Sequence, residues 1–358
     1  MNASPTPVLV LFGPTASGKT NVLLRLFEGG LDRHGDSRPA EVVSADSMQV
    51  YRGMDIGTAK PSAGEREKLP HHLIDIRNPN EQFNAGDFVR LAREAIADIA
   101  RREAFPVVCG GTGFYLKNLI LGLPESPPVD ETIRAALKDE LREKGAAALM
   151  EELARGDPVS ARRIHINDAY RLLRALEVLR LTGRPLSSFG VSGRGGRDSH
   201  GGTEDTGENI RWVCVGLSRP REELYRRIDA RCAAMFAQGL PDEVRKLCDM
   251  GYTPRDPGLR AIGYREFFVQ DEDEYRLSHD IAGVQALVAQ NSRRYAKRQI
   301  TFFASLPGVQ WIKAGDDDAE TAERLKEMIQ KKSHGGTGDT ENKKFEFPPY
   351  SPCLRERN

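Results

Sequence analysis

The sequence predicts an α/β fold: a parallel sheet that carries a phosphate-binding loop (P-loop) and is flanked by helices, with an all-helical domain inserted into it. Short apolar runs alternate with helical segments, and the first run leads into a glycine-rich turn and a helix start. From about residue 124 to 189 the pattern is almost purely helical. We therefore expect a discontinuous core from residues 1–122 and 210–330, and an inserted domain from residues 123–189.

The predicted elements of the sheet follow one another along the chain. Residues 8–12 are an apolar run typical of a buried strand, and residues 21–27 have a helical pattern. Residues 41–46 form a second strand that ends in a carboxylate. Residues 105–112 form a later strand that ends in two glycines and a threonine, and strand character returns at residues 210–217.

Two segments have compositions that disfavour a packed structure. Residues 190–209 contain seven glycines and no large apolar residue except Val191, so they bury too little surface to offset the entropy of ordering. We expect a flexible loop there. Residues 331–358 are polar and contain several prolines, and we expect a disordered tail.

Charge and composition exclude some classes of protein. Lys plus Arg and Asp plus Glu each number 52, so any surface for a polyanion must be local. No basic segment precedes the N-terminal apolar stretch, which is too short to span a bilayer, and we expect a cytoplasmic protein. The five cysteines include no C-x-x-C pair, which argues against a zinc site and a disulfide framework.

Residues 13–20 read GPTASGKT, a complete G-x-x-x-x-G-K-T phosphate loop. Gly13 and Gly18 let the backbone curl so that successive amides point at an anion, and Lys19 adds positive charge. The Thr20 hydroxyl is a candidate ligand for Mg²⁺. We therefore expect a site for a diphosphate or triphosphate formed by Gly13, Pro14, Thr15, Ala16, Ser17, Gly18, Lys19 and Thr20.

The residues at the ends of the later strands indicate which kind of reaction the site can catalyse, because ligands bind at the carboxyl ends of parallel strands. A nucleotide hydrolase normally carries an acid at the end of a further strand, but here that strand ends in Gly110-Gly111-Thr112. This leaves Asp46 as the carboxylate in the predicted cleft. It is a metal ligand, a general base directed at a second substrate, or a capping residue.

Two basic runs favour a polyanionic partner. Residues 162–184 contain six arginines against two acidic residues, and residues 293–298 contain four basic residues and no acidic one. Either run alone is also compatible with a solvated helix face. Arg226, Arg227 and Arg231 are candidates to face the phosphate site, since one helical turn separates the last two.

Residues 13–20, followed by residues 46–61 with the sequence DSMQVYRGMDIGTAKP, resemble the tRNA dimethylallyltransferase family, also called tRNA isopentenyltransferases. The resemblance covers roughly residues 7–315. The sequence resembles the bacterial members of the family, which have no zinc finger, since the tail holds only Cys353 and His334. Further matches are GGTGFY at 110–115, RRIHIND at 162–168, RLLRALE at 171–177, RAIGYR at 260–265 and AKRQ at 296–299.

This resemblance implies transfer of a dimethylallyl group from its diphosphate to the exocyclic amine of the adenine 3′ of the tRNA anticodon, giving isopentenyladenosine and diphosphate. It makes Asp46 the base that accepts the amine proton. It assigns Lys19, Thr112 and Arg231 to stabilising the diphosphate, and Thr20 to Mg²⁺.

The resemblance also implies that the inserted domain clamps the anticodon stem and loop of tRNA, and we expect a monomer. The implied tRNA contacts are Asp46, Ser47, Met48, Gln49, Thr112, Arg134, Tyr170, Arg171, Leu172, Leu173, Arg174, Arg260 and Arg265.

Chemistry adds one structural expectation and leaves alternatives open. The adenine base has to be turned out of its stack to react, so we expect a channel that diphosphate and adenine enter from opposite ends. One alternative is a P-loop small-molecule kinase in which the arginines of residues 162–184 form a lid. Others are an adenylate isopentenyltransferase and a nucleotide-switched RNA-binding module that needs no Asp46.

Overall fold

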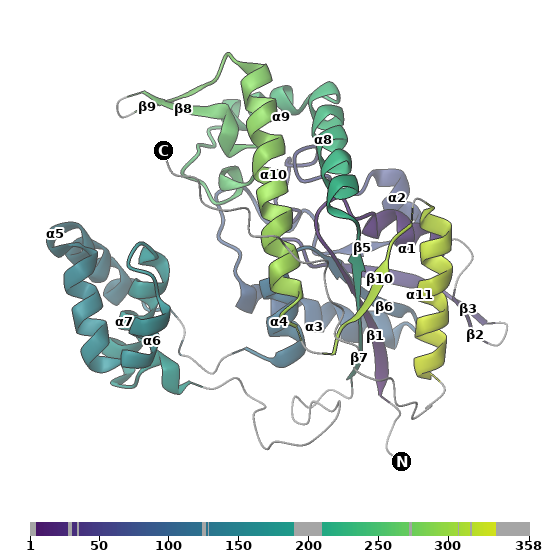
Figure 1. Ribbon diagram of the computed structural model, residues 1–358, viewed down its shortest axis with the longest axis horizontal. Coiled ribbons are helices and arrows are strands. Elements are labelled where there is room, and N and C mark those ends of the chain that lie inside the picture. The colour runs from purple at the N-terminus through teal and green to yellow at the C-terminus, as the bar shows by residue number, and fades with distance from the viewer. Residues whose placement is uncertain are drawn as a thin grey trace. The chain divides into compact units, whose positions relative to one another are not determined.

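Two compact units make up the chain: Met1–Leu116 with Asn209–Asn358, and Lys117–Glu208 (Figure 1). The division lies within helix α4 (Gly113–Leu121), somewhat earlier than the expected boundary at residue 122. The predicted loop 190–209 and residues 334–358 of the predicted tail lie outside the described residues. The computed structural model describes residues 5–27, 31–33, 36–123, 127, 129–189, 210–271, 274–306, 308–315 and 317–333.

A six-stranded parallel sheet forms the centre of the first unit, in the order β10-β7-β1-β6-β4-β5. The predicted α/β class is confirmed. The four strands expected from the sequence are present, whereas the two short edge strands β5 and β10 were not predicted. The strands are β1 (Thr6–Phe12), β4 (Ala40–Ser44), β5 (His71–His72), β6 (Phe105–Gly110), β7 (Ile210–Ser218) and β10 (Gln310–Lys313).

The central strand β1 is buried on both faces, which explains its uninterrupted apolar run Val8–Phe12. Helices cover the sheet: α1 (Lys19–Phe27) packs against α11 (Asp318–Ser333), and α3 (Ala85–Arg101) packs against β4 and β6. Helix α11 includes residues 331–333, so the prediction that the tail begins at residue 331 is wrong for these three, which continue an amphipathic helix.

A second layer of the same unit packs around a core that includes Met54, Leu259 and Tyr264. Helices α8 and α10 lie side by side in it (Figure 1). The layer's longer helices are α8 (Arg221–Ala237), α9 (Leu240–Asp249) and α10 (Ile281–Phe303). Smaller elements of the unit are α2 (Ala63–Lys68), η2 (Gly258–Arg260), η3 (Arg265–Phe267) and the hairpins β2 (Leu31–Arg33)–β3 (Asp36–Arg38) and β8 (Phe268–Asp271)–β9 (Glu274–Leu277).

Glu243 of α9 anchors the segment that follows Asp46. Its carboxylate accepts the backbone N–H groups of Asp55, Ile56 and Gly57 at 2.9, 2.8 and 3.1 Å, and the hydroxyl of Tyr264 at 2.6 Å. Charge-assisted hydrogen bonds of this kind are strong, so one carboxylate fixes a loop that has no regular secondary structure of its own.

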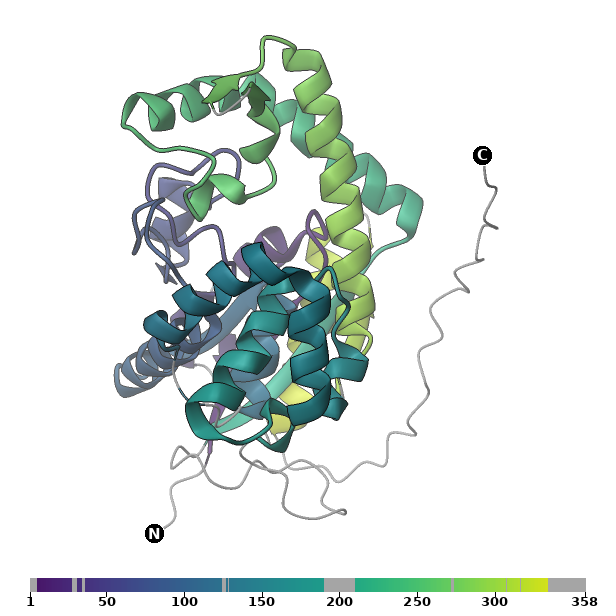
Figure 2. The same cartoon turned by 90° about the vertical axis from the view of Figure 1, so that its left-hand side faces the viewer.

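The second unit is helical throughout its described elements, as the predicted insertion requires. Its helices are α5 (Glu131–Gly156), α6 (Pro158–Arg163) and α7 (Ala169–Thr182), with the short η1 (Leu186–Ser188), and they pack on one another (Figure 2). Leu137, Leu153 and Leu176 belong to their common core. Gly183, with φ 67°, ends α7 in the left-handed conformation that glycine tolerates.

Among the described residues, none of the helices combines the length and the apolar character needed to cross a membrane. Four cysteines are described, and all four are free thiols: Cys109, Cys214, Cys232 and Cys248.

The close approach of β4 and β6 generates a prediction about stability. A Cβ at Gly110 would lie 2.1 Å from the backbone oxygen of Ala45, which has no freedom to move away. We expect Gly110→Ala to lower the free energy of unfolding by about 3 kcal/mol, measured by chemical denaturation. The control is Gly64→Ala in α2, where a Cβ meets nothing within 4 Å and stability should rise slightly. Equal stability of the two variants would contradict the close approach.

Candidate active site

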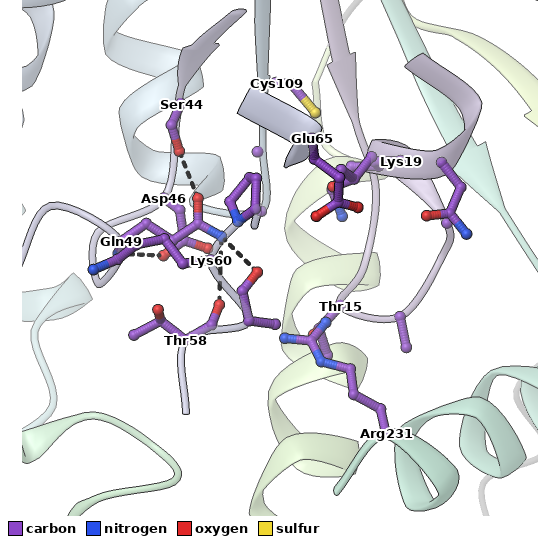
Figure 3. Close-up of a pocket in the computed structure, with 18 of the residues that line it drawn as sticks. Thr15, Lys19, Ser44, Asp46, Gln49, Thr58, Lys60, Glu65, Cys109 and Arg231 are labelled. Atoms are coloured by element: carbon purple, nitrogen blue, oxygen red, sulfur yellow. Dashed lines mark hydrogen bonds between the residues drawn. The ribbon is translucent and has the colours of Figure 1, made fainter. Parts of the chain in front are cut away.

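A cavity of about 740 Å³ lies at the carboxyl ends of β1, β4 and β6 (Figure 3). The phosphate loop forms one wall, and the segment from Asp46 to Glu65 forms another. Lys19 and Cys109 lie together in one part of the cavity, whereas Arg231 reaches it from α8 beside Thr15. This is the edge of a parallel sheet at which ligands bind.

Two arginines hold the phosphate loop by its backbone oxygens. Arg219 donates to the backbone oxygen of Ser17 at 2.9 Å, and Arg227 donates to that of Ala16 at 3.0 Å. A peptide carbonyl and the following N–H point in opposite directions, so the N–H of Gly18 points away from Arg219. Gly18, with φ 95°, itself lines the cavity. The loop therefore has the backbone arrangement expected of an anion site.

Lys19 is half-buried at this site and lies against the loop. Its Nζ donates to the backbone oxygens of Gly13 and Pro14 at 2.9 and 3.0 Å. Burial lowers the pKa of Lys19 to about 8; the neighbouring Arg231 also lowers it, while Cys109 and Asp46 act in the opposite direction. Burial likewise lowers the pKa of Arg231. Two desolvated cations thus face a cavity that contains room for an anion.

Asp46 begins a tight turn directly after β4. Its Oδ1 accepts the backbone N–H groups of Met48 and Gln49 at 2.9 and 3.3 Å, so one carboxylate oxygen caps the turn. The side chain of Gln49 is fixed as well, since it accepts from Ser44 at 2.9 Å and donates to the backbone oxygen of Thr58 at 3.4 Å. The capping role considered from the sequence is present, and it orients a carboxylate that also lines the cavity.

Thr112 lies beside this turn. Its Oγ1 accepts the N–H of Ser47 at 3.0 Å, and its own N–H donates to the backbone oxygen of Ala45 at 3.1 Å. Thr112 is not among the residues that line the cavity described above. The structure places it next to Asp46, with its hydroxyl engaged by the turn.

A second cavity, of about 270 Å³, adjoins the first and shares part of its wall. Asp46 and Arg231 border both cavities, and the channel open at both ends stays a prediction. The shared residues are Thr15, Asp46, Thr58, Arg231, Met235 and Tyr295.

Sequence reasoning missed Tyr295, which projects from α10 into this shared wall. Burial, followed by the charge of Asp46, raises its pKa to about 12, so it is a neutral phenol at ordinary pH. The sequence held one indication that Tyr295 belongs to the site: it lies one helical turn before Gln299, beside the matched AKRQ segment.

The other candidates in this unit are distributed over cavity and surface. Ser47 and Met48 line the second cavity, and Gln49 lines the first. Arg260 and Arg265 are exposed, and Arg265 pairs with Glu266 at 3.1 Å. Of the three candidate arginines on α8, Arg227 and Arg231 contact the loop, the latter through the Thr15 hydroxyl at 3.2 Å. Arg226 is exposed and lines neither cavity.

In the second unit, two of the candidate arginines surround a buried carboxylate. Glu177 is fully buried; its Oε2 pairs with Arg134 at 2.9 Å, and its Oε1 with Arg174 at 3.0 Å. The same Oε1 accepts the N–H of Asp130 at 2.8 Å. Because removing one member of a buried pair is strongly destabilising, Glu177 gives these arginines a structural role in addition to any contact with tRNA.

The remaining candidates of this unit lie on opposite sides of α7. Tyr170 is 72% exposed, and the side chain of Arg171 is 71% exposed. Leu172 and Leu173 belong to the helical core, so their side chains pack inside the unit. The guanidinium of Arg134 lies 5.7 Å from the centre of the Tyr170 ring, a cation–π distance.

Fold and site together define a P-loop α/β enzyme of the transferase kind. A loop and two half-buried cations are arranged to stabilise negative charge on a phosphate ester, and a fixed carboxylate borders an adjoining second cavity.

Comparison with known proteins identifies the particular family. The family model described as IPP transferase matches residues 49–306. The chain is 43% identical over 311 residues to the tRNA dimethylallyltransferase of Geobacter sulfurreducens, covering 86% of this chain and 92% of the relative. It is 41% identical over 325 residues to that of Solibacter usitatus, covering 91% and 98%. The chain belongs to the IPP transferase family.

Solved structures agree with this assignment. A tRNA isopentenylpyrophosphate transferase from Bacillus halodurans is 35% identical, with a TM-score of 0.61 over 91% of this chain and 98% of that one. A eukaryotic dimethylallyltransferase acting on tRNA, at 24% identity, has a TM-score of 0.69 over 89% and 77%, and shares the fold. The family resemblance inferred from the sequence motifs is confirmed.

The pKa of Lys19 generates a prediction about anion binding. Below about pH 8 the side chain is positive and attracts an anion, and above that pH it loses its charge. We expect the dissociation constant for inorganic diphosphate to rise about tenfold between pH 7 and pH 9, measured by calorimetry. Lys19→Arg keeps its charge and serves as the control, since ionisation of the ligand affects both proteins equally. Parallel pH profiles for the two proteins would contradict the prediction.

Proposed function

We propose that this chain, acting as a monomer, transfers the dimethylallyl group of dimethylallyl diphosphate to the exocyclic amine of the adenine 3′ of the anticodon in tRNA, releasing diphosphate. Membership of the IPP transferase family and the names of the relatives support prenyl transfer to tRNA. The structural observation that carries the proposal is that Asp46 and Arg231 border both a cavity containing a phosphate loop and an adjoining second cavity.

On the donor side, the bond that breaks joins the allylic carbon to the diphosphate oxygen. Positive charge develops on the prenyl carbon and negative charge on the leaving diphosphate. The loop amides, Lys19 and Arg231 lie where that negative charge is held, and their burial strengthens the interaction. Thr112 lines neither cavity, and its role here is to hold the turn that carries Asp46 by accepting the N–H of Ser47.

On the acceptor side, the bond that forms joins the adenine nitrogen to the allylic carbon. The amine is a weak nucleophile because its lone pair is delocalised into the ring. Asp46 accepts its proton as the carbon–nitrogen bond forms, and the backbone N–H groups of Met48 and Gln49 keep the carboxylate in position. The adenine reaches the carboxylate of Asp46 only when it is turned out of the anticodon loop.

Mg²⁺ fits this site as a companion of the diphosphate. Within the described residues no group of three or more His, Cys, Asp or Glu side chains is arranged to hold a metal. Mg²⁺ commonly takes one or two protein ligands and completes its shell with phosphate oxygens and water, and the Thr20 hydroxyl lines the cavity beside the loop. When bound there, the ion would neutralise charge on the diphosphate.

The second unit supplies a local surface for tRNA. Tyr170 offers an exposed ring on which a base can stack, and Arg171 offers an exposed charge for phosphate. Arg134 and Arg174, held by Glu177, lie at the same end of α7 and add positive charge. Arg260 and Arg265 are exposed on the other unit, where we propose that they also contact tRNA.

The kinase and adenylate isopentenyltransferase alternatives are not favoured. The relatives modify tRNA by name. Arg180, a candidate for a kinase lid, pairs with Glu140 at 2.6 Å and with Glu152 at 2.7 Å. Arg174 pairs with Glu177 in the same unit, so these two arginines of the segment serve the packing of the helical unit.

One assay tests the proposed function. Purified protein is incubated with radiolabelled dimethylallyl diphosphate, Mg²⁺ and unmodified tRNA, and label in the tRNA is counted. We expect wild type to label tRNA and Asp46→Asn to lose at least a hundredfold in rate, because the proton acceptor is removed. Asp55→Asn is the matched control, since Asp55 lines the same cavity away from the shared wall and should retain activity.

Wild type that transfers no label would overturn the proposed function. Equal rates for wild type and Asp46→Asn would overturn the role of Asp46 and favour an RNA-binding protein whose carboxylate only caps a turn.

The exposed arginine of α7 generates a prediction about tRNA recognition. Arg171→Ala should raise KM for tRNA and reduce the slope of log KM against log salt by about 1, because one phosphate contact is lost. Arg142→Ala is a close match: both arginines are exposed helical residues that pair with an aspartate three positions earlier. It should leave KM unchanged. Identical salt slopes for the two variants would place the tRNA elsewhere.

A further inference from the structure

A buried amide on α10 joins the two halves of the site. Gln299 is 5% exposed. Its Oε1 accepts the backbone N–H of Thr15 in the phosphate loop at 2.9 Å, and its Nε2 donates to the backbone oxygen of Gly111 at 2.8 Å. The side chain therefore bridges the loop after β1 and the loop after β6, and both its polar atoms are satisfied.

The packing leaves Gln299 little freedom. A Cβ at Gly111 would lie 2.5 Å from its Nε2, and a Cβ at Gly113 would lie 2.3 Å from the ring of Phe302, three residues further along the helix. Only glycine admits so close an approach of α10 to the end of β6. A buried amide that lost either partner would leave a polar group unpaired, which is unfavourable.

Each end of the bridge leads to a group with a proposed chemical role. Thr15 borders both cavities, and its hydroxyl accepts from Arg231 at 3.2 Å. Gly111 precedes Thr112, whose Oγ1 accepts the N–H of Ser47, the residue after Asp46. One side chain thus connects the leaving-group loop to the turn that carries the base.

The phosphate loop has other supports, so Gln299 is not needed to form it. Arg219 and Arg227 hold the backbone oxygens of Ser17 and Ala16, and the N–H of Ser17 donates to the oxygen of Pro14 at 3.2 Å. Removing the bridge would leave the loop assembled but free to shift relative to the turn.

We propose that Gln299 is a positioning residue that fixes the phosphate loop at the correct distance from Asp46. This inference rests on the proposed function, since it concerns the alignment of the allylic carbon over the loop with the amine beside Asp46. Reactions between two bound groups depend steeply on such alignment, and a displacement of about 1 Å can cost a hundredfold in rate.

Two substitutions separate positioning from a role in folding or anion binding. Gln299→Met has a similar length and makes neither hydrogen bond. We expect its kcat for tRNA labelling to fall by about 10- to 100-fold, while the dissociation constant for inorganic diphosphate with Mg²⁺ changes by less than about threefold. Both constants are measured at a temperature at which circular dichroism shows the variant folded.

Gln299→Glu supplies a readout that a purely structural role would not move. The ionised carboxylate can accept from Thr15 but cannot donate to Gly111, whereas the protonated carboxyl can do both. We therefore expect its kcat, divided by that of wild type, to rise as pH falls. The same ratio for Gln299→Met should not depend on pH. This variant also carries the test if Gln299→Met does not fold.

The control is Gln290→Met, at an exposed position on the same helix, which should behave as wild type. The inference is overturned by wild-type kcat in Gln299→Met, by a loss of kcat matched by an equal loss of diphosphate affinity, or by a ratio for Gln299→Glu that does not change with pH. Failure of the proposed function would appear separately, as wild type that labels no tRNA.

Discussion

Two half-buried cations that face the same cavity are the constraint on which this site depends. Lys19 and Arg231 are desolvated, so their charge is unfavourable until an anion binds, and burial lowers the pKa of each. In the free protein the carbonyls of Gly13 and Pro14 satisfy the ammonium of Lys19. In the proposed reaction, a bound diphosphate would replace these carbonyl partners with a stronger one, and the negative charge that forms as the diphosphate leaves would be stabilised further.

The rest of the fold holds that arrangement rigid. The sheet brings the ends of β1, β4 and β6 together, and the contact of Gly110 with Ala45 lets two strand ends meet without intervening side chains. Arg227 of α8 and Arg219, which precedes that helix, hold carbonyls of the loop, and Glu243 of α9 fixes the segment after Asp46. Preorganisation of this kind spares the site from reorganising when the reaction occurs.

The proposed function divides chemistry and tRNA recognition between the two units. All residues of the two adjoining cavities belong to the unit built on the sheet. The helical unit has its own core and its own buried ion pairs, and it presents Tyr170 and Arg171 on its surface. A P-loop that binds an anion in many proteins is thereby combined with a surface suited to RNA, since function depends on the residues at the site more than on the fold.

The sequence by itself determined the features that lie within short segments. The GPTASGKT loop, the carboxylate after β4 and the helical insertion were predictable because a contiguous motif fixes its own backbone and a periodic pattern fixes its own buried face. Tertiary structure alone decided which distant side chains complete the site. Gln299 contacts residues 284 and 188 positions away, and nothing local marks Tyr295 as a cavity residue or Glu177 as a buried carboxylate. These contacts form only when the helices pack, because packing brings together residues that lie far apart in the sequence and share no local pattern.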